Sequence, residues 1–187
     1  MNALASVEGR ERIRLFCALR LAEQTTERLV AWQREAFADL HEGRVLSPAH
    51  LHVTLAFLGH RPVEEVEPIA AALRAAAAGA ELPALSVQRY RETRSVGMLE
   101  LADEQGRAAA LALDLHERLE ALEVYEPERR EWRPHVTVLR FRRRPRLNPP
   151  LPDLERFAPS DAAVYLSRLR SSGAQYEVLE SVALGGG

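Results

Sequence analysis

The sequence contains no lysine, because all 25 of the basic residues in its 187 positions are arginine. This absence excludes mechanisms that need a lysine nucleophile, a lysine Schiff base or the lysine of a phosphate-binding loop. Cysteine is almost as scarce, since Cys17 is the only one, and an internal disulfide is therefore excluded. A single unpaired cysteine is typical of a reducing compartment, so we expect a cytoplasmic protein.

Long hydrophobic runs and a strong charge of one sign are also missing. No apolar run approaches the roughly 18 residues that a membrane span needs, and no secretory signal pattern opens the chain. The formal net charge of −2 excludes a uniformly basic nucleic-acid binder, although it permits local basic patches. With 47% apolar and 28% charged residues, the composition is that of a globular protein, and the length predicts one domain over residues 1–187.

Hydrophobic periodicity predicts an α+β protein with the element order β-α-β-α-β-β-α-β-β-β. The predicted helices cover residues 22–41, 68–78 and 104–122. The predicted strands cover residues 13–19, 52–58, 85–90, 96–101, 135–139, 162–169 and 175–183. An Arg/Pro-rich loop is expected over residues 142–152.

One short pattern occurs twice, 83 residues apart. A strand that begins H-V-T-L at His52 is matched by a strand that begins H-V-T-V at His135. Since side chains alternate across a strand, each histidine shares a face with a threonine, Thr54 or Thr137. The opposite face has the composition of a buried surface and is predicted to carry Val53, Leu55, Phe57, Val136 and Val138.

Two imidazoles and two hydroxyls on neighbouring strands form a plausible acid–base site. Because the ordinary pKa of histidine is near 6.5, one copy can be neutral and act as a base while the other is charged and acts as an acid. Hydrolysis of a phosphodiester needs both, since water loses a proton and the departing alkoxide gains one. Threonine hydroxyls can donate hydrogen bonds to the non-bridging phosphate oxygens. No carboxylate cluster suggests a metal site, so we expect neither a metal nor a cofactor.

Other interpretations of these residues are open. A single H-x-T pattern in a strand is common by chance, and a lone histidine is more often structural than catalytic. A non-catalytic module that binds RNA ends or phosphate would use the same surface. His50 and His52 form an H-L-H pair that could ligate zinc, but a third ligand at a suitable spacing is lacking. Trp132 could stack on a base or belong to the core.

The second motif is surrounded by positive charge. Eight arginines and a single acid, Glu131, lie between Arg129 and Arg146. Such a local field suits an RNA phosphate backbone, with Arg140 and Arg133 as candidates for substrate binding, although a solvated loop in an arginine-biased sequence would show the same pattern.

At these positions the sequence resembles the two-histidine (2H) phosphoesterases, specifically the RNA 2′,3′-cyclic phosphodiesterases that are also called 2′-5′ RNA ligases. The resemblance spans nearly the whole chain. It is carried by R-L-F-C-A-L from Arg14, L-H-V-T-L-A-F-L-G from Leu51, R-P-H-V-T-V-L-R from Arg133 and L-S-R-L-R-S-S-G-A-Q-Y from Leu166. The paired motifs in this order are specific, and the flanking segments are supporting evidence.

The resemblance implies a bilobal fold in which two pseudo-symmetric lobes of antiparallel sheet, with outer helices, surround a central cleft. It implies that His52 donates a proton to the leaving 3′-oxygen, that His135 accepts a proton from water, and that Thr54 and Thr137 hold the phosphate. The expected substrates are 2′,3′-cyclic phosphates at RNA 3′ ends or small cyclic nucleotides, which would be opened to 2′-phosphates, with 2′-5′ ligation as a minor activity. Arg140 matches a family position, no obligate protein partner is expected, and a monomer is predicted.

Overall fold

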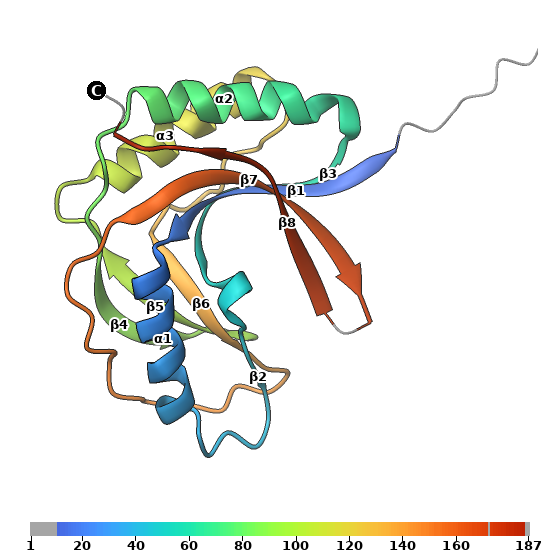
Figure 1. The fold of residues 1–187 in the computed structure, drawn as a ribbon. Coiled ribbons are helices and arrows are strands. Elements are labelled where there is room, and N and C mark those ends of the chain that lie inside the picture. The colour runs from blue at the N-terminus through green and yellow to red at the C-terminus, as the bar shows by residue number, and fades with distance from the viewer. Residues whose placement is uncertain (1–10, 172, 186–187) are drawn as a thin grey trace, which may run out of the picture.

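A computed structural model describes residues 11–171 and 173–185; the ends of the predicted domain and Ser172 lie outside the described residues. All strands belong to one antiparallel sheet, whose order is β4-β5-β6-β3-β1-β7-β8, with β2 paired to β6 (Figure 1). The strands are β1 (Arg12–Leu21), β2 (Arg44–Val45), β3 (His52–Pro62), β4 (Ser86–Glu92), β5 (Val96–Ala102), β6 (His135–Arg140), β7 (Pro159–Arg170) and β8 (Gly173–Val182). The helices are α1 (Glu23–Ala36), α2 (Val66–Ala78) and α3 (Arg107–Ala121), with short 3₁₀ turns η1 (Pro48–His50) and η2 (Val63–Glu65).

This architecture confirms the predicted α+β class and the predicted order of the main elements, and two local differences have physical causes. The first predicted helix was extended too far, because α1 ends at Ala36 and the next residue, Phe37, leaves the helical conformation. The Phe37 ring is buried and packs edge-on against Trp32, with ring centroids 5.3 Å apart. The two-residue strand β2 was not predicted, since its pairing with β6 depends on a distant segment.

The three helices pack on the same side of the sheet. Their buried side chains join one core cluster with apolar residues of β1, β3, β5 and β6, among them Leu15, Val53, Leu99 and Val136. A second, smaller cluster lies on the opposite face and consists of Phe16, Ala18, Ala163 and Tyr165, with Tyr176 packed against it. The sheet curls so that the helices lie outside it, and no helix of the described chain joins the second cluster (Figure 1).

A β-bulge in β3 makes one sequence prediction wrong. Phe57 was assigned to the buried face, but 49% of it is exposed. Along β3 the pairing with β1 advances from Thr54 directly to Ala56, so that Leu55 is an extra residue. A bulge reverses the alternation of side chains beyond it, and Phe57 therefore lies on the face that carries His52 and Thr54.

The two halves of the sheet meet between β3 and β6. The only residue pair assigned to this contact in the described chain is Val53 with Val136, whereas β1 pairs with β3 over most of its length. Strands β4, β5, β6 and β2 lie on one side of this junction, and β3, β1, β7 and β8 lie on the other. The division of the chain into two lobes stays a prediction.

The buried carboxylate of Glu92, at the end of β4, fastens the Arg/Pro-rich loop 142–152 to the sheet. It accepts hydrogen bonds from the backbone N–H groups of Arg146 (2.9 Å) and Leu147 (2.8 Å) and from the Arg144 guanidinium (3.1 Å). The Tyr90 hydroxyl donates a further bond at 3.2 Å. Since only 7% of Glu92 is exposed, its carboxylate is stabilised by these donors rather than by water.

We therefore expect Glu92→Ala to lower the free energy of unfolding by about 1–3 kcal/mol, because the four donors that the buried carboxylate holds lose their acceptor. Chemical denaturation followed by circular dichroism measures this value. The matched control is Glu117→Ala, which removes an exposed carboxylate on α3 and should change the stability by less than about 0.5 kcal/mol. Equal effects of the two substitutions would contradict the anchoring role of Glu92.

Candidate functional site

The junction between β3 and β6 brings the two His-x-Thr motifs together. With Val53 opposite Val136 in an antiparallel pair, His52 is level with Thr137 and Thr54 is level with His135. Both valines are fully buried in the core. The side chains of the four motif residues must therefore project from the other face of the sheet, the face that bears the smaller aromatic cluster.

His135 is oriented by the backbone just before it. Its Nδ1 lies 3.0 Å from the carbonyl oxygen of Arg133, and because a carbonyl can only accept, Nδ1 carries the proton. In the neutral ring this leaves the lone pair on Nε2. The arrangement has the form of a general base, with one nitrogen anchored and the other available.

His52 lies among aromatic rings. Its ring centroid is 5.1 Å from that of Phe16, 5.6 Å from Tyr176 and 5.8 Å from Tyr165. The residue as a whole is partly exposed, but its Nδ1 is buried and makes no hydrogen bond with any described residue. The edge of the ring that carries Nε2 is the part left to meet a ligand.

The surroundings of His52 disfavour its protonated form. Burial lowers the pKa of His52 to about 4, and the nearby charges of His50, His135 and Arg140 act in the same direction, outweighing the His50 backbone carbonyl, which acts to raise it. The influence of His135 places the two motif histidines within electrostatic reach of each other. In the protein alone His52 is therefore neutral at pH 7.

His50 is a structural residue rather than a metal ligand. Its Nε2 is 2.6 Å from the carbonyl oxygen of Ala174, and its Nδ1 is 2.6 Å from the Ser47 hydroxyl. Both ring nitrogens are therefore engaged, and the zinc interpretation of the H-L-H pair loses a ligand. The ring also packs edge-on against Tyr176, at 4.7 Å, and so helps to hold β8 over His52.

Trp132, in the second half of the chain, stabilises the backbone of the first motif. Its indole N–H donates a 3.0 Å hydrogen bond to the carbonyl oxygen of Thr54, and its ring packs against the core. Sequence analysis offered base stacking or core packing and did not find this bond, because the partner is 78 residues away. The short segment 132–135 thus contacts both motifs.

The two predicted arginines are placed differently. A bulge at Val138, where the β5 pairing advances from Thr137 to Leu139, turns Arg140 toward the face of His135. Arg140 is exposed, and its charge contributes to the low pKa of His52. Arg133 is also exposed, with its guanidinium 3.8 Å from Glu131, and its clearest contribution to the site is its carbonyl group.

Other arginines of the same stretch are engaged elsewhere. Arg143 pairs with Glu42 at 3.1 Å, and Arg144 pairs with the buried Glu92. The positive field predicted from composition is therefore only partly directed at the motifs.

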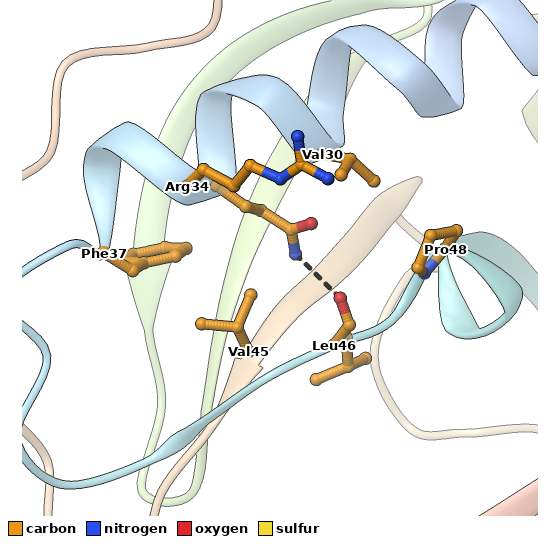
Figure 2. A pocket seen from close by; sticks show the side chains of 7 residues that line it. Val30, Arg34, Phe37, Val45, Leu46 and Pro48 are labelled. Atoms are coloured by element: carbon orange, nitrogen blue, oxygen red, sulfur yellow. Dashed lines mark hydrogen bonds between the residues drawn. The ribbon is translucent and has the colours of Figure 1, made fainter.

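Neither of two cavities that lie beside the described part of the sheet is lined by the motif residues. One, of about 220 Å³, lies between α1 and the segment around β2, where the Gln33 amide donates to the Leu46 carbonyl (Figure 2). Its lining is mainly apolar. The other, of about 480 Å³, lies beside the β7–β8 hairpin and includes His50, Tyr176, Arg168 and Arg170. It adjoins His52 through Tyr176.

Comparison with known proteins gives a consistent result. Residues 19–96, which include the first motif, match the family model described as LigT-like phosphoesterase. No curated protein sequence matches the chain significantly.

Several solved structures share the fold. TT0787 of Thermus thermophilus is 27% identical, has a TM-score of 0.78, and aligns over 93% of this chain and 99% of its own. E. coli LigT complexed with 3′-AMP is 23% identical, has a TM-score of 0.77, and aligns over the same shares. The PDE domain of MHV ns2 is more distant, at 15% identity and a TM-score of 0.55, over 89% of this chain and 99% of its own.

The depressed pKa of His52 predicts a ligand-dependent titration. In the free protein the His52 ring should titrate at about pH 4, and binding of 2′-AMP should raise this pKa because the phosphate charge stabilises the imidazolium. Proton NMR of the ring hydrogens measures both values. The resonance of exposed His41 should not respond to the nucleotide. A His52 pKa near 4 with and without saturating nucleotide would contradict a phosphate site at this residue.

The same shift predicts how stability depends on pH. Because the pKa of His52 is lower in the folded protein than in the unfolded chain, the unfolded state binds more protons between about pH 6.5 and 4. The free energy of unfolding should fall as pH decreases through this range, by an amount on the order of 1–3 kcal/mol. Replacing His52 by Gln should flatten this part of the profile, and an unchanged slope would contradict the assignment.

Proposed function

Because the chain belongs to the LigT-like phosphoesterase family and is thus a phosphoesterase, we propose that it hydrolyses 2′,3′-cyclic phosphates at RNA 3′ ends to 2′-phosphates. The observation that carries the proposal is the register at Val53 and Val136. It sets each histidine level with the threonine of the other motif, on the face without helices. Two acid–base groups and two hydroxyl donors can therefore surround one phosphate.

His135 is the proton acceptor in this proposal. Its Nδ1–H is anchored on the Arg133 carbonyl, so the Nε2 lone pair can take a proton from water. As that proton leaves, the water oxygen forms a bond to phosphorus. The imidazolium that results keeps its Nδ1–H bond throughout.

His52 is the proton donor, and the substrate itself supplies the condition for its protonation. Lowering a histidine pKa from 6.5 to about 4 corresponds to about 3 kcal/mol. A phosphate charge about 4 Å away contributes about 4 kcal/mol at an effective dielectric constant of 20. The substrate's charge thus offsets the depression and returns the pKa of His52 to near its ordinary value, so that the protonated ring is available near neutral pH when the phosphodiester is bound.

The reaction is balanced between the two rings. The bond from phosphorus to the 3′-oxygen breaks as His52 gives that oxygen its proton, and the phosphate remains on the 2′-oxygen. Thr54 and Thr137 donate hydrogen bonds to the non-bridging oxygens, where negative charge increases in the transition state. Arg140 adds positive charge to the same face. No step requires a metal or a cofactor.

The proposed substrates are RNA 3′ ends or small cyclic nucleotides, and the enzyme would act in the cytoplasm as a monomer. E. coli LigT, which shares the fold, has been solved in complex with 3′-AMP, and this supports a nucleotide as the class of ligand. None of the helices in the described part of the chain has both the length and the apolar character needed to span a bilayer. The same ring opening with an RNA 5′-hydroxyl in place of water would give a 2′-5′ linkage, and ligated products can be sought in the same assay.

We expect His52→Ala and His135→Ala each to lower kcat on a 2′,3′-cyclic phosphate oligonucleotide by about 10²–10⁴-fold, because each removes one proton transfer. The wild-type rate should not change with EDTA. The assay separates the 2′-phosphate product by chromatography.

The matched control is His41→Ala, which removes an exposed histidine outside both motifs and should leave the rate unchanged. Full activity in either motif variant would exclude the proposed mechanism. Tight RNA binding without turnover by the wild type would instead identify a non-catalytic RNA-end-binding module.

A sulfur leaving group separates the two histidine roles. With a 3′-thio cyclic substrate the departing thiolate needs little protonation, so we expect the loss in His52→Ala to shrink to below about 10-fold. The loss in His135→Ala should remain as large as with the oxygen substrate, since water must still be deprotonated. The opposite pattern would show that the donor and acceptor roles are exchanged.

A further inference from the structure

A charged cluster lies next to His135 on the open face of the sheet. Glu100, in β5, is the residue that pairs with His135 across the ladder, so the two side chains project side by side. The flanking Leu99 and Leu101 are buried in the main core, which directs Glu100 to the face of the two motifs. The reaction described above does not use this cluster.

Two arginines of β4 are fixed in place by the Glu100 carboxylate. Arg89 donates from Nε to Oε2 at 2.5 Å, and Arg91 donates from Nη1 to Oε1 at 2.8 Å. The Glu100 side chain is only 9% exposed, whereas those of Arg89 and Arg91 are 57% and 50% exposed. The carboxylate is thus covered while the guanidinium groups face solvent.

Glu100 is ionised despite its burial. Burial acts to raise its pKa, but the hydrogen bonds from Arg91 and Arg89 outweigh this effect, and the pKa of Glu100 lies below its usual value. One negative and two positive charges leave the cluster with a net charge of about +1. A guanidinium has five N–H donors, and Glu100 occupies only part of those that the two arginines supply.

The cluster has more positive charge than a structural ion pair needs, and this excess suits the binding of an anion. One arginine would suffice to neutralise Glu100, and the second adds an uncompensated charge on the open face. Because the carboxylate already orders both side chains, an incoming phosphate does not bear the full entropic cost of ordering them. Arginine also binds phosphate through two parallel hydrogen bonds, which a fixed guanidinium presents in advance.

We propose that Arg89 and Arg91 bind the internucleotide phosphate immediately 5′ of the reacting cyclic phosphate, so that the enzyme prefers RNA oligonucleotides to cyclic mononucleotides. The inference rests on the proposed function. Every other phosphate of such a substrate lies on its 5′ side, because the cyclic phosphate ends the chain. Strand β4 is two strands from β6, about 10 Å, and the arginine side chains reach back across β5 toward the histidines.

The test compares three substrates: 2′,3′-cyclic AMP, the dinucleotide ApA with a terminal 2′,3′-cyclic phosphate, and that dinucleotide with an uncharged methylphosphonate linkage. We expect wild-type kcat/KM to be about 10-fold higher for the charged dinucleotide than for the methylphosphonate, as one charge-assisted phosphate contact allows. A plot of log kcat/KM against log salt should be steeper by about 0.7 for the charged dinucleotide.

The variant Arg89→Gln/Arg91→Gln should reduce the ratio between the charged and methylphosphonate dinucleotides to about 1. Arg118→Gln is the matched control, since it breaks an ion pair of the same kind with Asp114 on α3, and it should leave the ratio at its wild-type value. If the double variant folds poorly with Glu100 unpaired, the charge-free triple variant that adds Glu100→Gln replaces it. The comparison of substrates on the wild type needs no variant.

The outcomes separate the two proposals. Equal wild-type rates on the charged and methylphosphonate dinucleotides would overturn the phosphate subsite and leave the hydrolytic function standing. If the wild type hydrolyses none of the substrates, the proposed function fails. The subsite is then tested by calorimetry, which measures the affinity of ApA 2′-phosphate with a charged and with a methylphosphonate linkage. About 10-fold weaker binding of the methylphosphonate form, lost in the double variant, would support the subsite, and equal affinities would overturn it.

Discussion

The contact between Val53 and Val136 is the constraint on which the site depends. Both side chains are fully buried, so the pair fixes which face of each strand meets the core and which face presents the histidines and threonines. A shift of one residue at this point would turn one strand over relative to the other, so that one histidine would face the core and its neighbouring valine the open face, at a large cost in free energy. The core therefore determines the register, and the register determines the site.

The short segment just before the second motif supports this junction. The Trp132 indole holds the backbone of the first motif, and the Arg133 carbonyl holds the ring of the second. Both contacts come from Trp132 and Arg133, which lie just before β6. The site is thus assembled from two distant parts of the chain. It is held in place by hydrogen bonds that take no part in the proposed reaction.

Much of the site could be predicted from the sequence because the period-two pattern of H-V-T is local. That pattern places histidine and threonine on one face, whatever the neighbouring strands are. The bulges at Leu55 and Val138 could not be predicted in the same way, since they depend on the pairing of β3 with β1 and of β6 with β5, and they place Phe57 and Arg140 on the face of the motif residues. Glu100 was missed because the pairing of β5 with β6 is a long-range contact.

The two bulges also explain how a repeated motif yields unequal halves. Each follows its His-x-Thr by one residue, and the residue then turned to the ligand face is Phe57 in one half and Arg140 in the other. The Phe57 ring lies under the Arg14 guanidinium at 4.7 Å, whereas Arg140 is an exposed charge. His52 lies among aromatic rings that favour its neutral form, and His135 stands beside the fixed charges of Glu100 and its arginines. Two copies of one motif in unlike environments can hold different protonation states, as paired acid and base groups require.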